Sequence, residues 1–166
     1  MRYIAGTKSY GICYQGNYDE LLVYSDADFA GEKETRKSTT GYISILAGAP
    51  VTWSSHRQGC VSRSTIKAEY IAASSAAQET MWLRMMLTEL QVISDEPIKL
   101  FVDNQSAICL VKNSEHHELT KHIDVKFHYI RECVENQSIF IQYVSSEKQL
   151  ADFLTKVLPH DKFCLN

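Results

Sequence analysis

The order of strand-like and helix-like segments is the feature that most restricts the fold of this chain. Three short β-rich runs come first, at residues 21–25, 41–46 and 50–54. The later segments alternate: helical 64–90, β-rich 98–102, helical 103–112 and 121–135, β-rich 138–144, helical 146–157. Neighbouring strands followed by alternating helices and strands predict an α/β domain built on one mixed sheet.

The glycines support this division of the chain. All seven lie between Gly6 and Gly59, so turn-rich strands are expected early and well-bounded helices and strands afterwards. The segment 47–49 is short enough to join the second and third strands as a hairpin. Ser64 or Thr65 can cap the long helix that follows.

Composition and charge exclude several classes of protein. The 166 residues suit one domain, and the net charge of −3 argues against gripping nucleic acid by overall charge. No apolar run approaches the ~20 residues of a membrane span, and the N-terminus lacks the apolar core of a signal peptide. Five cysteines without a Cys-x-x-Cys pair predict a reduced, intracellular compartment.

Charge is distributed unevenly along the chain. Residues 31–67 contain six basic side chains and two acidic ones, so the rest of the chain carries a charge of −7. Such asymmetry allows a basic face, although a solvated surface is the more common explanation.

Four acidic residues stand out by position, and each also has an ordinary explanation. Asp26 follows an apolar strand, where a surface aspartate would be comfortable. Asp103 also ends a strand, but aspartate is a favoured helix N-cap. Glu69 heads a stripe of small and apolar residues, where burial is costly unless a cation, a donor or the helix dipole compensates. Asp152 fits an acid at a helix start.

Together the four acids predict more than any one of them. Two strand ends and two helix starts can meet at one edge of an α/β sheet, where functional sites usually form. Crowded carboxylates repel one another unless hard cations bind between them, and oxygen-only ligands favour Mg²⁺ or Mn²⁺. Two such ions can activate water and stabilise a leaving oxygen in phosphodiester hydrolysis.

The order of motifs resembles the ribonuclease H domain of copia-type LTR-retrotransposon polyproteins. The matching motifs are YSDADFAG (24–31), RKSTTGY (36–42), VTWSSHRQ (51–58), KAEYIAAS (67–74), FVDNQSAICLVKN (101–113), TKHIDVKFHYIRE (120–132) and QLADFLTKVLP (149–159). Residues 1–19 resemble the end of the preceding reverse-transcriptase segment, which leaves 20–166 as the ribonuclease H domain. The resemblance implies a five-stranded mixed sheet with helices on both faces.

The resemblance also implies a reaction and its residues. The family cleaves the RNA strand of RNA–DNA hybrids by in-line attack of a metal-activated water. Its four catalytic and metal-binding acids fall on Asp26, Glu69, Asp103 and Asp152, with two Mg²⁺ or Mn²⁺ ions per site. Asp28 competes with Asp26 because it has the same strand parity, but Asp26 directly follows the apolar run.

The implied partners are an RNA–DNA hybrid and the reverse-transcriptase portion of the parent polyprotein, with no membrane, in an intracellular setting such as a cytoplasmic retrotransposon particle. Candidate nucleic-acid contacts comprise two polar residues after Asp103, two at the start of the long helix and four basic side chains. They are Asn104, Gln105, Ser64, Thr65, Arg36, Lys37, Arg57 and Arg63. Contacts to ribose hydroxyls and backbone phosphates suit these side chains.

The chain departs from the family pattern in ways that keep other hypotheses open. Residues 144–148 lack the histidine that many ribonucleases H carry there, Lys67 replaces an acid, and Leu119 replaces an arginine. A catalytically weak or idle interaction module of a reverse transcriptase, and a DNA strand-transfer enzyme of the same fold, are the alternatives. A zinc site from His117 and His122 with Cys109 or Cys133 fits no standard spacing.

Overall fold

A computed structural model describes residues 2–16, 18, 20–32, 34–112 and 121–156. Within these ranges it contains five strands, four α-helices and two 3₁₀ turns. The strands are β1 (Leu22–Ala27), β2 (Thr39–Leu46), β3 (Ala49–Arg57), β4 (Ile98–Val102) and β5 (Ile139–Tyr143). The helices are α1 (Arg2–Thr7), α2 (Thr65–Glu89), α3 (Gln105–Lys112) and α4 (Lys121–Glu135), and the turns are η1 (Ser146–Lys148) and η2 (Asp152–Leu154).

The strands form one mixed sheet in the order β3-β2-β1-β4-β5. β1, β2 and β3 pair antiparallel, whereas β1, β4 and β5 run parallel. The predicted mixed α/β sheet is therefore confirmed. Because β1 and β4 are parallel neighbours, their carboxyl ends, which carry Asp26 and Asp103, lie at the same end of the sheet.

The β2–β3 hairpin has a two-residue turn. Ala47 and Gly48 both have positive φ, 53° and 76°, as the tight hairpin turn that matches strand twist requires. The hairpin predicted from the sequence is confirmed, although its connection is 47–48 and Ala49 already begins β3. Glycine adopts this conformation at no steric cost, whereas Ala47 adopts it in a buried position.

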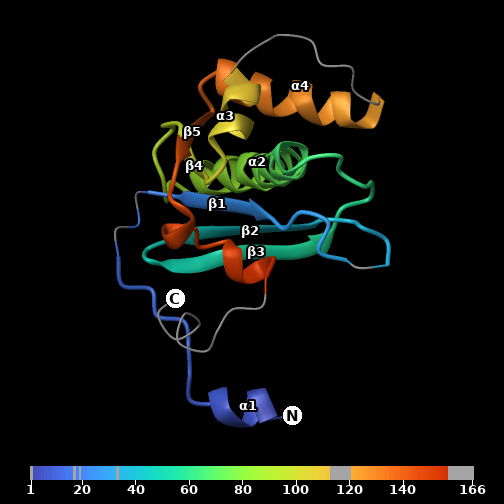
Figure 1. Ribbon diagram of the computed structural model, residues 1–166. Helices are drawn as coiled ribbons and strands as arrows, with labels where there is room; N and C mark the ends of the chain where they lie inside the picture. The colour runs from blue at the N-terminus through green and yellow to red at the C-terminus, as the bar shows by residue number, and fades with distance from the viewer. Residues whose placement is uncertain (1, 17, 19, 33, 113–120, 157–166) are drawn as a thin grey trace.

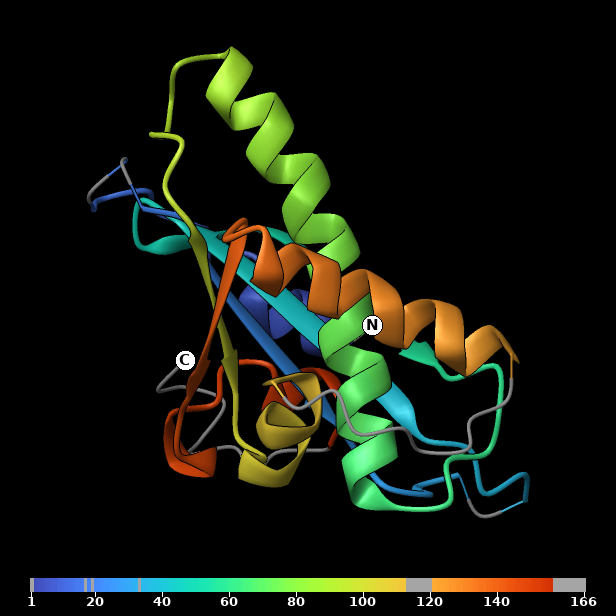
Figure 2. The ribbon, with the colours of Figure 1, turned by 90° about the horizontal axis from the view of Figure 1, so that it is seen from above.

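The resemblance implies helices on both faces of the sheet; among the described residues, α2, α3 and α4 all lie over one face (Figure 1). Seen from above, α4 crosses α2, and α3 lies beside the end of β4 (Figure 2). The small residues of α2 allow close packing: Ala68 and Ala72 form a cluster with Ala27 of β1. The larger core contains residues such as Val23, Leu100 and Ile130. Burial of this apolar surface is the main force that holds the helices on the sheet.

The final helix predicted over 146–157 is wrong for the described residues. The chain instead forms the short turns η1 and η2, joined through buried Gln149. The Gln149 amide donates to the Ser25 carbonyl at 2.9 Å and accepts from the Ala151 backbone N–H at 3.2 Å. These tertiary bonds hold the segment against β1 in a non-helical path.

Gly41 of β2 makes room for that segment on the sheet. It is paired with Asp26 of β1 in the register. A Cβ at Gly41 would lie 2.7 Å from the Thr155 Cγ2, 2.9 Å from the Leu154 Cβ and 3.1 Å from the Ala151 carbonyl. The missing side chain therefore lets the segment after Gln149 approach the sheet beside Asp26.

The N-terminal residues lie apart from the sheet and its helices. Helix α1 stands away from the rest in Figure 1, joined by an extended stretch. Contact with the sheet begins at the β2–β3 hairpin, where the Gln15 N–H donates to the Ala47 carbonyl at 3.0 Å and the Tyr14 hydroxyl to the Pro50 carbonyl at 2.9 Å. None of the described helices combines the length and the hydropathy that a bilayer span requires.

Gly41→Ala should destabilise the protein because the added Cβ collides with the segment 151–155. We expect a loss of about 1–3 kcal/mol in the free energy of unfolding, measured by urea denaturation. Gly59→Ala is the matched control, since a Cβ there meets nothing within 4 Å. Equal stability of the two variants would contradict the tight packing at Gly41.

Candidate active site

Asp26 lies inside the sheet. It is the penultimate residue of β1 and is only 1% exposed, so the ordinary explanation as a surface aspartate is wrong. Its Oδ2 accepts a hydrogen bond from the Thr155 hydroxyl. The competing Asp28 is used differently, because its carboxylate accepts from the Thr39 backbone N–H in the loop after β1. Of these two aspartates, Asp26 is the one whose carboxylate lies close to those of Glu69 and Asp103.

Glu69 lies in the first turns of α2 and is 7% exposed. Ser64 caps this helix, as predicted, by accepting from the Lys67 N–H at 3.3 Å. The Ala27 backbone N–H donates to the Glu69 carboxylate. Its Oε2, however, is buried without any hydrogen-bond partner. A buried carboxylate oxygen without a donor is costly in a stable fold, and it is the arrangement that an incoming cation would relieve.

Asp103 directly follows β4 and is half-buried. The alternative that Asp103 caps the next helix is wrong, because the Asn104 side chain accepts from the Ala107 N–H at 3.0 Å. The Asp103 Oδ2 instead accepts from the Ser146 hydroxyl at 2.7 Å. Ser146, from a segment 43 residues later in the chain, thus helps to fix the orientation of this carboxylate.

Asp26, Glu69 and Asp103 meet at one point. One oxygen from each lies within 4.8 Å of the others, and among the described residues this is the one such acidic or metal-ligating group of three or more. Burial, and then the neighbouring carboxylates Asp26 and Asp103, raise the pKa of Glu69 to about 9. Burial also raises the pKa of Asp26, against the opposing effects of Thr155 and Lys156. The fold therefore crowds carboxyl groups where burial and mutual repulsion disfavour their charged forms unless a cation binds.

Asp152 lies near this group without joining it. Its Oδ1 forms an ion pair with the ammonium of Lys156, one turn later in the chain. The same ammonium lies 3.6 Å from the Asp26 Oδ2. Three of the four predicted acids are thus brought together, and the fourth is close enough to affect the pKa of Asp26.

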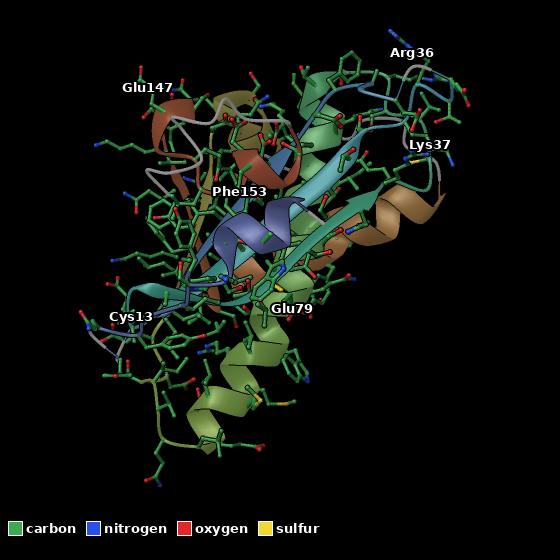
Figure 3. All side chains as sticks on the ribbon, turned by 90° about the horizontal axis from the view of Figure 1, so that it is seen from below. Cys13, Arg36, Lys37, Glu79, Glu147 and Phe153 are labelled. Atoms are coloured by element: carbon green, nitrogen blue, oxygen red, sulfur yellow. The ribbon has the colours of Figure 1, made fainter. Side chains whose placement is uncertain are left out.

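The predicted nucleic-acid contacts lie around the same end of the sheet. Arg36 and Lys37 belong to the loop after β1, and Figure 3 shows them beside this end, with Glu147 on the other side. Arg36, Arg57, Arg63, Thr65 and Gln105 are exposed. Three candidates are already engaged: Arg57 forms an ion pair with Glu32, the Ser64 hydroxyl caps α2, and the Asn104 side chain caps α3.

Several residues that position the site carry no recognisable signal in the sequence. Buried Gln58 donates from its amide to the Ala68 carbonyl at 2.9 Å and to the Thr40 hydroxyl at 3.1 Å. It thereby ties the first turn of α2, which carries Glu69, to β2. Thr155 and Ser146 hold two of the carboxylates, but their partners are over 40 residues away in sequence.

The zinc alternative falls mostly outside the described residues. His117 and the side chain of His122 are not described, and the departure at Leu119 lies there too. Cys109 is an exposed free thiol and Cys133 a buried one.

The sheet order, helix placement and acidic group define the ribonuclease H fold. The ribonuclease H1 LC11, isolated from compost, matches with a TM-score of 0.59 and 18% identity over 82% of this chain and 92% of that one. The foamy viral protease–reverse transcriptase in complex with an RNA/DNA hybrid matches with a TM-score of 0.58 and 13% identity. The match covers 89% of this chain and 20% of the foamy viral chain. No protein-family model matches the chain.

The homologues of the chain are retrovirus-related Pol polyproteins from plant transposons. It is 44% identical over 163 residues to the polyprotein of transposon TNT 1-94 from Nicotiana tabacum. The aligned region is 98% of this chain and 12% of that polyprotein. The polyprotein of transposon RE1 from Arabidopsis thaliana is 40% identical over 164 residues, covering 98% and 11%. The chain therefore spans only about a ninth to an eighth of the length of these two polyproteins. The predicted resemblance is confirmed.

Glu69→Gln should change how stability depends on pH. In the unfolded chain Glu69 loses its proton near its usual pKa of 4.5, whereas the folded protein retains the proton up to about pH 9. The folded state binds the extra proton between these values, so wild-type stability falls as pH rises through them. Between about pH 5 and pH 8, in EDTA, wild type should lose at least ~2 kcal/mol more than Glu69→Gln in urea denaturation.

Glu89→Gln supplies the control for this prediction. Glu89 is exposed at the far end of the same helix. The Glu89→Gln variant should follow the wild-type dependence on pH. If Glu69→Gln follows it as well, Glu69 is not protonated in the folded protein as described.

Proposed function

We propose that this chain is a ribonuclease H that cleaves the RNA strand of RNA–DNA hybrids with the help of divalent metal ions. The observation that carries the proposal is the meeting of Asp26, Glu69 and Asp103 on the ribonuclease H fold. Two neighbours of that fold support the substrate class, since each is a complex with an RNA/DNA hybrid.

The three carboxylates suit hard divalent cations. Every donor is an oxygen, and the partnerless Oε2 of Glu69 supplies a ligand atom that no protein group uses. Asp26, Glu69 and Asp103 would hold Mg²⁺ or Mn²⁺, with Asp152 as the fourth acid of a two-ion site. When bound, such ions neutralise phosphate charge and make a water molecule more acidic.

The protein's own part in the reaction is positioning. Ser146 and Thr155 fix the directions of the Asp103 and Asp26 carboxylates, and Gln58 anchors the turn that carries Glu69. These contacts set the place where a scissile phosphate must lie for a water to attack in line with the leaving oxygen.

Recognition of the hybrid would use the residues around the site. Gln105 is exposed at the start of α3. The side-chain oxygen of Asn104 accepts the helix-cap hydrogen bond, which leaves the side-chain nitrogen of Asn104 to contact a ribose or base. Arg36, Lys37 and Arg63, with Thr65, would contact backbone phosphates. Ser64 serves the helix cap first, and Arg57 would have to leave Glu32.

The homologues supply the wider context of the proposal. Residues 1–19 would be the end of a reverse-transcriptase segment and 20–166 the ribonuclease H domain of a Pol polyprotein. The reverse-transcriptase portion would then be a partner in the same chain, and the setting an intracellular retrotransposon particle.

Cleavage of a labelled RNA–DNA hybrid tests the proposal. Asp103→Asn and Glu69→Gln should each lower the cleavage rate in Mg²⁺ or Mn²⁺ by at least ~100-fold, because each removes a carboxyl group that would bind the ion. Glu147→Gln is the control, an exposed acid at the same end of the molecule (Figure 3), and should keep the wild-type rate.

The outcomes separate the candidate functions. If both Asp103→Asn and Glu69→Gln keep the wild-type cleavage rate, the proposed site is wrong. Hybrid binding without cleavage by wild type would identify an interaction module, and a preference for duplex DNA would identify a different nuclease of this fold.

Salt dependence tests the nucleic-acid surface separately. Binding to the hybrid should weaken as salt rises, because released counterions contribute to phosphate contacts. Arg63→Ala should lower the slope of log affinity against log salt by about one unit. Arg57→Ala should lower it less, since its guanidinium is already paired with Glu32. Affinity independent of salt would contradict the assignment of this surface.

A further inference from the structure

A lysine side chain, Lys156, places its positive charge beside the acidic group. The Lys156 ammonium forms an ion pair with the Asp152 Oδ1 and lies 3.6 Å from the Asp26 Oδ2. The Lys156 side chain is about half exposed at 48%, whereas Asp26 is 1% and Asp152 19% exposed. The ammonium of this half-exposed lysine thus lies against two carboxylates that are less exposed than the lysine itself.

The position of Lys156 is fixed from two sides. The Lys156 N–H donates to the Asp152 carbonyl at 3.0 Å, and the preceding Thr155 hydroxyl donates to both the Asp26 carboxylate and the Asp152 carbonyl. Gln149 anchors the start of this segment to β1, and Gly41 gives it room on β2. Hydrogen bonds and packing therefore hold the segment that places Lys156 beside Asp26.

From this geometry we propose that the Lys156 ammonium is the counter-cation of the carboxylate site in the metal-free protein and that divalent ions must displace it. Until a divalent ion binds, Lys156 holds Asp152 apart from the other three carboxylates. This inference rests on the proposed metal-dependent function. It assigns Lys156 a positioning role, since the lysine acts through Asp26 and Asp152.

The argument for competition is electrostatic. Asp26 has one oxygen facing both Thr155 and Lys156, and the same carboxylate belongs to the group of three that would bind an ion. A divalent ion that binds there has two possible effects. It displaces the ammonium, which then loses its attraction to the carboxylates, or it is repelled by the ammonium that stays. In either case, removal of the lysine charge strengthens binding of a divalent ion and weakens the metal-free protein.

Calorimetric titration of the metal-free protein with Mn²⁺ tests this role without any cleavage reaction. Lys156→Gln and Lys156→Met should bind Mn²⁺ about tenfold more tightly than wild type. Lys156→Arg keeps the charge and should restore nearly wild-type affinity. Lys148→Gln, an exposed lysine of η1, is the matched control and should leave the affinity unchanged.

Thermal melting gives an independent readout. In EDTA, Lys156→Gln should melt a few degrees below wild type, and saturating Mn²⁺ should remove this difference, because the bound ion replaces the lost charge. Lys156→Met serves the same purpose if the glutamine variant fails to fold.

The possible results distinguish the inference from the function on which it rests. If wild type binds Mn²⁺ and both neutral variants bind it equally or more weakly, the role of Lys156 is overturned and the metal-dependent function stands. If wild type binds no Mn²⁺, the proposed function itself fails, and the inference fails with it.

Discussion

The convergence of three carboxylates in a mostly buried position is the constraint on which the rest of the site depends. Burial and mutual repulsion raise the pKa of Glu69 to about 9, and the Glu69 Oε2 has no hydrogen-bond partner. Such an arrangement opposes stability, so the surrounding fold must impose it. Parallel pairing of β1 with β4 brings the two aspartates to one end, and α2 carries the glutamate to meet them.

The same constraint explains the polar contacts around the site. Thr155, Ser146 and the Ala27 N–H each donate to one of the three carboxylates, while Lys156 adds a positive charge. These contacts lessen the repulsion only in part, which is why the group remains suited to a divalent cation. Stability in the metal-free state and readiness to bind an ion are therefore opposed at this end of the sheet.

Much of the fold could be predicted from the sequence because its signals are local. The apolar runs of β4 and β5, the cap at Ser64 and the small-residue stripe of α2 each depend on near neighbours. The last segment could not be predicted in this way. Its sequence is compatible with a helix, but Gln149 bonds to β1 and the turn packs against Gly41, which are contacts to residues over 100 positions earlier.

The sequence by itself determined which residue types are available to the site, since their order already singles out the four acids and the resemblance to ribonuclease H. Only the tertiary structure decided how those acids are used. It buried Asp26 in the sheet, gave the helix cap to Asn104 and not to Asp103, and placed Lys156 on Asp152. These outcomes depend on distances between segments far apart in the chain, which strand pairing and packing set and local sequence does not record.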